Sequence, residues 1–254
     1  MEVTPADGTT LVSSAAGDGE TVAFVGDAGY GAWQWGWQHA ALTGPFETIV
    51  YDHRGTGRSD APPGPYSVET LADDLETVLR AHDARNAHLV GAGLGGMVAL
   101  DYARRYSRAR SLCLLCTAAT GENIDTTPLA APRDDPVALR DALTNALSAE
   151  FFKEQDSTID QLVEWRTEDA TPDGWAAQQA AIEGFDAGAL YELTLPALVC
   201  HGTADAVWPV SGGEQLAEGL PKGEFFSLDG AGHLCHVEHS RVVNDELLGF
   251  LEAR

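Results

Sequence analysis

The sequence predicts an α/β protein in which a mostly parallel sheet is covered by helices on both faces. Short apolar runs alternate with helical stretches toward both ends of the chain. The runs are apolar throughout, which is typical of parallel strands buried on both sides. Residues 121–190 interrupt this alternation and lack clear strand signals. We therefore expect a core formed by residues 1–120 and 191–254, with 121–190 inserted as a helical cap.

The expected elements follow one another in the order that such a sheet requires. Strands are expected at 21–25, 46–51, 87–91, 109–116, 196–200 and 224–228. Helices are expected in the tryptophan-rich segment 33–37, after Ser67, and at 95–106, 211–219 and 236–252. Within the cap, apolar residues at helical spacing are Val137, Leu139, Leu143 and Leu147.

The composition is strongly acidic, with 39 Asp and Glu residues against 15 Lys and Arg and a formal charge of −24. Only two of the basic residues are lysines, Lys153 and Lys222. Such a charge keeps a protein soluble but destabilises its compact state by self-repulsion unless salt screens it. An acidic, lysine-poor surface is typical of a high-salt cytoplasm, so we expect a halophilic protein. No basic patch favours a nucleic acid or an anionic membrane as partner.

The chain is expected to be cytoplasmic and to have a small molecule as its substrate or ligand. No segment typical of a signal peptide precedes Thr9, and no apolar run approaches the roughly 18 residues of a membrane span. Four cysteines are too few for a disulfide scaffold in a chain of 254 residues. Cys113 and Cys116 lie three apart in an apolar strand, which points them to opposite faces, so a redox pair is not expected. The oligomeric state stays open.

The most informative segment is 88–100, which reads as a strand, a sharp turn and a helix. This is the layout of the G-x-S-x-G turn that presents the nucleophile of α/β-hydrolases. Gly91 and Gly95 occupy the two flanking glycine positions, but Gly93 stands at the tip where serine is expected. Glycine has no side chain and cannot attack a carbonyl.

Three further motifs occur in the chain order of that superfamily. The turn 52–59 resembles its D-x-R-G-x-G-x-S motif, and its glycines indicate a structural role. The loop 26–29 is a loose match to H-G-x-G, and 230–233 matches G-x-G-H. The chain therefore resembles the α/β-hydrolase superfamily and is expected to have the α/β-hydrolase fold. Within the superfamily it is most similar to enol-lactonases of the 3-oxoadipate type, in the segments 51–66, 95–99 and 116–119.

The resemblance implies a role for four residues. Asp205 stands at the position of the triad acid, and His233 stands at that of the catalytic histidine. The backbone N–H groups of Ala28 and Leu94 take the positions of the oxyanion-hole donors. Because these donors belong to the backbone, the loss of serine at Gly93 need not remove them.

Other side chains are candidates for the site. Asp27 could act as a nucleophile or base, although a hydrogen bond to loop amides is the favoured role. Trp33 and Trp208 could line an apolar pocket. A cluster of possible metal ligands near the C-terminus does not favour a metal site, because the triad role already explains its first member. We expect no metal and no cofactor; the cluster is His233, Cys235, His236 and His239.

The leading functional hypothesis is an ester- or lactone-type hydrolase without a covalent nucleophile. Glycine at position 93 is expected to leave a space for water, which His233 oriented by Asp205 would activate. One alternative is a non-catalytic protein that binds a small ligand in a retained pocket. Another is a lyase or proton-transfer enzyme that uses the His233–Asp205 dyad.

Overall fold

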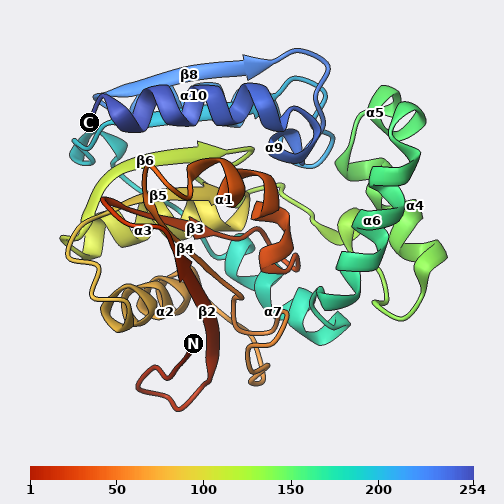
Figure 1. The fold of residues 1–254 in the computed structure, drawn as a ribbon, viewed down its shortest axis with the longest axis horizontal. Helices are drawn as coiled ribbons and strands as arrows, with labels where there is room; N and C mark the ends of the chain where they lie inside the picture. Colours follow the sequence, from red (N-terminus) through yellow and green to blue (C-terminus); the bar gives the residue numbers. More distant parts are fainter.

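The computed structural model describes residues 1–254 and confirms the expected fold class. Eight strands form one sheet in the order β1-β2-β4-β3-β5-β6-β7-β8 (Figure 1). The six strands from β3 to β8 pair in parallel, whereas β1 and β2 pair antiparallel at one edge. The strands are β1 (Glu2–Val3), β2 (Leu11–Ala16), β3 (Thr21–Val25), β4 (Glu47–Tyr51), β5 (Ala87–Ala92), β6 (Ala109–Leu115), β7 (Ala197–Gly202) and β8 (Gly223–Leu228).

The first two strands, β1 and β2, have no counterpart among the predicted elements. β2 alternates between buried and accessible residues and carries two serines, so it lacks the continuous apolar run by which the other strands are found. At the opposite edge, most of β8 is half-buried or exposed, because one of its sides has no neighbouring strand.

Helices cover both faces of the sheet, and the strand residues alternate between them. In β3, Val22 and Phe24 pack with the cluster under α1 and α10, while Ala23 and Val25 pack with the cluster under α2, α3 and α8. The core helices are η1 (Ala32–Trp35), α1 (Gly36–Leu42), α2 (Val68–Ala81), α3 (Leu94–Arg105), α8 (Val210–Gly219), α9 (Cys235–Glu238) and α10 (Ser240–Glu252).

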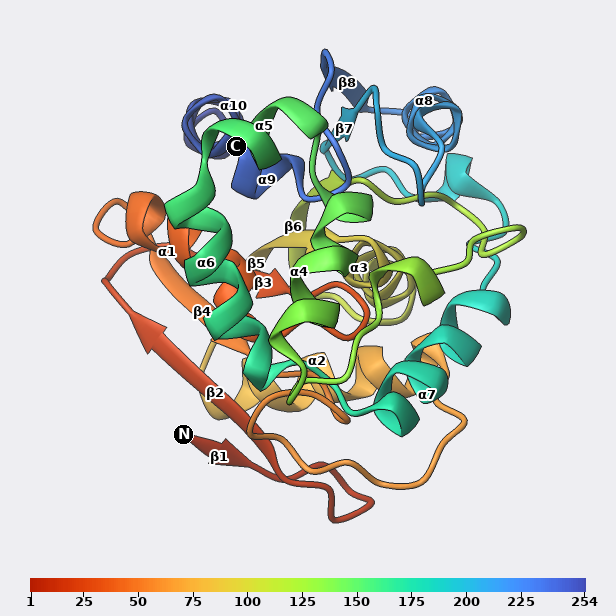
Figure 2. The same cartoon turned by 90° about the vertical axis from the view of Figure 1, so that its right-hand side faces the viewer.

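Residues 121–190 form helices beyond the carboxyl ends of the strands, which supports the proposal that they act as a cap (Figure 2). A buried ion pair between Arg166 and Asp169 organises this segment, with 2.7 Å between Nε and Oδ2. Arg166 further donates to the carbonyls of Leu129 and Leu139. The segment contains η2 (Thr127–Leu129), α4 (Pro136–Ala146), α5 (Ala149–Glu154), α6 (Asp156–Trp165), η3 (Arg166–Glu168) and α7 (Pro172–Glu183), and the short helix η4 (Leu190–Glu192) spans its end.

Two details of the expected helices are wrong. Val137 is not on the packed side of its helix but is 71% exposed, because it lies in the first turn of α4 beside the cap residue Asp135. The expected helix 236–252 is two helices that meet at His239, whose φ of −115° and ψ of 40° interrupt the helical path. The break lets α9 follow the loop before it while α10 packs against α1. None of the helices combines the length and the apolar composition that crossing a membrane requires.

The charge of −24 leads to a prediction about salt. Raising KCl from about 0.1 M to about 2 M is expected to stabilise the folded state by about 2 kcal/mol or more, because screening removes self-repulsion. Thermal unfolding followed by circular dichroism should then show a midpoint at least about 4 °C higher. At pH values near the sequence pI of about 4.4, the same salt step should have a smaller effect. An unchanged midpoint at neutral pH would contradict the expected halophilic character.

Candidate active site

The residues predicted to carry chemistry meet at the carboxyl edge of the sheet. Asp27 lies in the loop after β3, Gly93 in the turn after β5, Asp205 in the loop after β7 and His233 in the loop after β8. Because parallel strands place their carboxyl ends at one edge, loops that are distant in sequence converge there. All four side-chain positions are buried, with Asp27 fully enclosed and His233 1% exposed.

The expected histidine–acid pair is present. Nδ1 of His233 lies 2.8 Å from Oδ2 of Asp205. The other oxygen of this carboxylate accepts hydrogen bonds of 2.9 Å from the backbone N–H groups of Val207 and Trp208. The indole of Trp208 lies nearly parallel to the imidazole, with 6.3 Å between ring centroids. Asp205 is therefore fixed by its own loop and fixes the histidine in turn.

The carboxylate of Asp27 lies where the sequence predicts an oxyanion hole. Its Oδ1 accepts hydrogen bonds of 2.7 Å from the N–H of Ala28 and 2.8 Å from the N–H of Leu94. Its Oδ2 lies 2.6 Å from Nε2 of His233. The two donors are thus placed as the sequence predicts, and Asp27 bonds loop amides as favoured. The sequence did not reveal that the same carboxylate reaches the histidine.

The prediction of a water-filled space above Gly93 is wrong, because the side chain of Asp27 fills that space. A Cβ built on Gly93 would lie only 1.9 Å from Oδ1 of Asp27. The backbone at Gly93, with φ of 48° and ψ of −116°, is one that glycine adopts far more readily than residues with side chains. Gly93 and Asp27 therefore fit each other sterically: the missing side chain leaves the volume that the carboxylate takes.

The electrostatics of the site favour a protonated histidine. Burial alone would lower the pKa of His233, but the negative charges of Asp205 and Asp27 outweigh it and raise this pKa well above its usual value. Burial would raise the pKa of Asp205, yet the facing imidazolium and the loop N–H groups lower it. In the resting site an imidazolium is consequently held between two carboxylates.

The cluster of possible metal ligands does not converge on one point. His236 stacks on Trp35 with 4.8 Å between centroids, and burial lowers its pKa to about 3. The Sγ atom of Cys235 lies 3.5 Å from that of Cys116, a neighbour that the sequence did not indicate. Cys116 does approach the site, with its Sγ and ligand atoms of Asp205 and His233 within 4.8 Å of one another. However, both ring nitrogens of His233 already face carboxylates, and burial raises the pKa of the Cys116 thiol, so this group carries no metal proposal.

The loop that carries Asp27 is bonded to both the core and the helical segment above it. Oε1 of Gln178 in α7 accepts a 2.6 Å hydrogen bond from the N–H of Gly29. The indole N–H of Trp33 donates to Asp169 at 2.8 Å, so this residue joins the loop to the helical segment. The two tryptophans expected to line a pocket are therefore separated: Trp208 flanks the histidine, whereas Trp33 helps to hold the loop. The hydroxyl of Tyr30, in the same loop, is buried and has no hydrogen-bond partner.

The turn 52–59 has the structural role that its glycines indicate. Oδ1 of Asp52 accepts from the N–H of Ala32, and the hydroxyl of Ser59 donates to the carbonyl of Asp52. Arg54 forms two 2.6 Å bonds with the buried carboxylate of Asp74. These contacts fix the turn against the start of η1 and against α2, outside the group of reactive side chains.

Comparison with known proteins agrees with this geometry. The profile of a family described as the alpha/beta hydrolase family matches residues 22–246. The chain belongs to the α/β hydrolase family. A protein of Variovorax paradoxus (strain S110), whose name describes it as a carbamate hydrolase, RutD, is 32% identical over 251 residues, 92% of each chain.

Solved structures of other α/β hydrolases confirm the fold and the predicted resemblance to enol-lactonase-like hydrolases. The enol-lactonase from Burkholderia xenovorans LB400 superposes with a TM-score of 0.89 at 24% identity, over 99% of this chain and all of that one. A thermophilic esterase from Thermogutta terrifontis gives a TM-score of 0.87 at 26% identity, over 100% and 98% of the two chains. These likenesses establish the fold, while the pairing of Gly93 with Asp27 is read from this chain alone.

The contact between Asp27 and His233 predicts a change in titration. Asp27→Asn removes one of the two negative charges beside the imidazole, so the pKa of His233 should fall relative to wild type. A pH titration followed by NMR on histidine-labelled protein measures this directly. Asp229→Asn serves as the matched control, because Asp229 is exposed and lies at the start of the loop that carries His233. This variant should leave the titration of His233 unchanged. Identical curves for Asp27→Asn and wild type would show that the carboxylate does not face the histidine in solution.

Proposed function

We propose that this α/β hydrolase uses Asp27 in place of serine to form a covalent intermediate, and that His233 with Asp205 activates the water that hydrolyses it. The observation that supports the proposal is the setting of the Asp27 carboxylate. One oxygen accepts from the Ala28 and Leu94 N–H groups, and the other lies against His233. A carboxylate is an established nucleophile in covalent catalysis.

The position of the two N–H donors favours one class of substrate. They bind Oδ1 of Asp27, so they cannot hold the carbonyl oxygen of a substrate at the same time. They are instead placed to stabilise negative charge on the carboxyl group of Asp27 itself, which develops when water attacks an ester of this residue. An ester of Asp27 with an alkyl group arises by attack on a saturated carbon, a step that needs no oxyanion hole. The favoured substrates therefore carry a leaving group on saturated carbon, as in an alkyl halide or an epoxide.

The reaction balances in two steps. In the first, Oδ2 of Asp27 forms a bond to the saturated carbon, and the bond to the leaving group breaks with its electron pair. In the second, His233 takes a proton from water, and the resulting hydroxide attacks Cγ of Asp27. The tetrahedral oxyanion at Oδ1 is held by the N–H groups of Ala28 and Leu94, then collapses and expels the alkoxide, which takes a proton from His233. The Asp27 carboxyl group then passes its own proton to the imidazole, which restores the resting carboxylate and imidazolium. The net change is cleavage of one carbon–leaving-group bond by water.

The charges of the site couple these two steps. In the resting site the negative charges of Asp205 and Asp27 raise the pKa of His233, so its imidazole is protonated and cannot act as a base. Esterification of Asp27 removes one of these charges and lowers that pKa. The imidazolium then releases its proton, to the oxygen freed from an epoxide or to solvent once a halide has left, and becomes a base before water attacks the ester. Asp205 keeps its charge and continues to orient the ring.

The intermediate can be trapped. His233→Gln should slow the second step by about 10³-fold or more while leaving Asp27 in place to be alkylated. Incubation with 1-bromobutane should then add a butyl group to the protein, and incubation with styrene oxide should add the whole epoxide. Peptide mapping should locate either adduct on Asp27. The wild type, after turnover in ¹⁸O-labelled water, should carry label in the Asp27 carboxylate.

Asp27→Asn with His233→Gln is the matched control and should gain no mass. Turnover of these substrates without an adduct in His233→Gln and without ¹⁸O in Asp27 would rule out the covalent route. Absence of both turnover and adduct, with the tested electrophiles, would favour a role in ligand binding.

A second candidate is direct hydrolysis of an ester or lactone carbonyl by water that His233 and Asp205 activate. The names of the carbamate hydrolase and esterase relatives favour this candidate. It requires the Asp27 carboxylate to leave the oxyanion hole, because the substrate carbonyl needs the N–H groups of Ala28 and Leu94.

The variant Asp27→Gly separates the two candidates because it changes their activities in opposite directions. It empties the oxyanion hole, so hydrolysis of p-nitrophenyl acetate should rise above wild type if water attacks the carbonyl directly. If Asp27 is the nucleophile, turnover of alkyl electrophiles should instead fall by about 10³-fold or more. Initial rates measured on both types of substrate decide between the two candidate functions. Unfolding midpoints confirm that the variant folds.

A further inference from the structure

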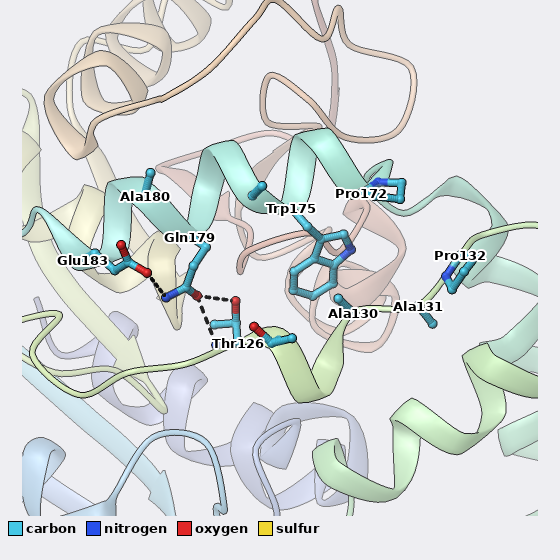
Figure 3. Close-up of a pocket in the computed structure, with 11 residues that line it drawn as sticks. Thr126, Ala130, Ala131, Pro132, Pro172, Trp175, Gln179, Ala180 and Glu183 are labelled. Carbon is cyan, nitrogen blue, oxygen red and sulfur yellow. Dashed lines mark hydrogen bonds between the residues drawn. The ribbon is translucent and has the colours of Figure 1, made fainter.

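A cavity of about 480 Å³ lies in the helical segment above the core, between η2 and α7 (Figure 3). Its volume falls within the range of small-molecule sites in proteins. The cavity belongs entirely to residues between 126 and 183 and contains none of the reactive side chains described above. It is therefore a separate place in the molecule where a ligand could bind.

The residues that line the cavity do not favour the binding of an anion. Alanine, proline and the indole of Trp175 form most of the walls, and the lining contains no Lys, Arg or His. Its single charged residue is Glu183, whose carboxylate accepts from Nε2 of Gln179 at 3.1 Å. The overall charge of −24 repels anions further. The composition of the walls favours an apolar molecule that is neutral or cationic.

One polar group of the lining lacks a partner. Gln179 is satisfied, because its Oε1 accepts from Thr126 and its Nε2 donates to Ile124 and Glu183. By contrast, Nε1 of Trp175 is buried and has no hydrogen-bond acceptor. The residue as a whole is 4% exposed. Figure 3 shows this nitrogen on the side of the indole that faces Pro172 and Pro132. A buried donor without a partner is costly, and an acceptor on a bound molecule would remove that cost.

We propose that this cavity binds an apolar, neutral or cationic small molecule whose acceptor oxygen or nitrogen takes the hydrogen bond of Trp175 Nε1. The site goes beyond the proposed hydrolysis and does not depend on it. Trp175 nevertheless connects the cavity to the active-site loop. A Cβ on Gly29 would lie 2.0 Å from Cε2 of this indole, and the ring of Tyr30 packs edge-on against it at 5.7 Å.

The probe for the test is 2-acetyl-6-(dimethylamino)naphthalene, a neutral fluorophore with a carbonyl acceptor and an emission that shifts to the blue in apolar surroundings. Titration into the wild type should give saturable binding with a blue shift. Trp175→Phe keeps an aromatic wall and removes the N–H, so the dissociation constant should rise about 2- to 10-fold. Ala176→Phe, at an exposed position of the lining, should fill the cavity and weaken binding by about tenfold or more.

Ala40→Phe, at an exposed position in α1, is the matched control and should bind the probe as the wild type does. Asp27→Asn should also bind normally, which separates this site from the proposed chemistry. No saturable binding by the wild type, or equal affinity of Ala176→Phe and Ala40→Phe, would overturn the proposal. Loss of binding in Asp27→Asn would place the probe at the reactive carboxylate and would overturn it as well.

Discussion

The bridge that the Asp27 carboxylate forms between two backbone N–H groups and His233 is the interaction on which the site depends. It joins the oxyanion loop, the turn after β5 and the histidine loop through one side chain. The three bonds satisfy both oxygens of a group that is fully buried. Without these bonds, the buried carboxylate would have neither water nor hydrogen-bond partners to offset the cost of its burial. The Asp27 charge and its three partners therefore form a single unit.

This unit explains why a hydrolase fold can keep its parts without serine. A site that has merely decayed is under no constraint to keep a buried acid paired with its histidine or to fill the oxyanion hole with a matching anion. Here Asp205 remains bonded to His233, and the space left by Gly93 is taken by a group of suitable size and charge. The arrangement places a second carboxylate on the histidine, on the side opposite Asp205 and next to the turn after β5.

The parallel strands and the order of the motifs could be predicted from the sequence, because they depend on local patterns. The contact of Asp205 with His233 was implied by the resemblance of their motifs to those of the superfamily. The antiparallel strands β1 and β2 were missed because β1 has only two residues and β2 lacks the continuous apolar run of the parallel strands. The break at His239 was missed because helical spacing continues across it. The contact of Asp27 with His233 could not be predicted for another reason. It depends on the side-chain conformations of two residues that lie 206 positions apart in the sequence. The departures of Gly93 and Asp27 from the family motifs were its only sequence signal. They identify Asp27 as a candidate to replace the missing serine, but not its contact with the histidine.

The loop that carries Asp27 is held from two sides, and this determines how the carboxylate is positioned. From the core, Oε1 of Gln34 accepts from the N–H of Asp27, and Nε2 of His53 donates to the carbonyl of Gly26. Burial lowers the pKa of His53 to about 4, so this ring is a neutral donor at pH 7 and adds no charge beside the carboxylate. From the helical segment, Gln178 accepts from the N–H of Gly29.

Because these bonds go to the backbone of the loop, they limit its movement more than side-chain packing alone would. A carboxylate held in this way keeps one oxygen against its two N–H donors with little loss of freedom upon reaction, which is the preorganisation that stabilises a developing charge. The residues that hold it come from both the core and the segment 121–190. The helical segment therefore does more than lie beyond the strands: together with the core, it determines where the Asp27 carboxylate lies.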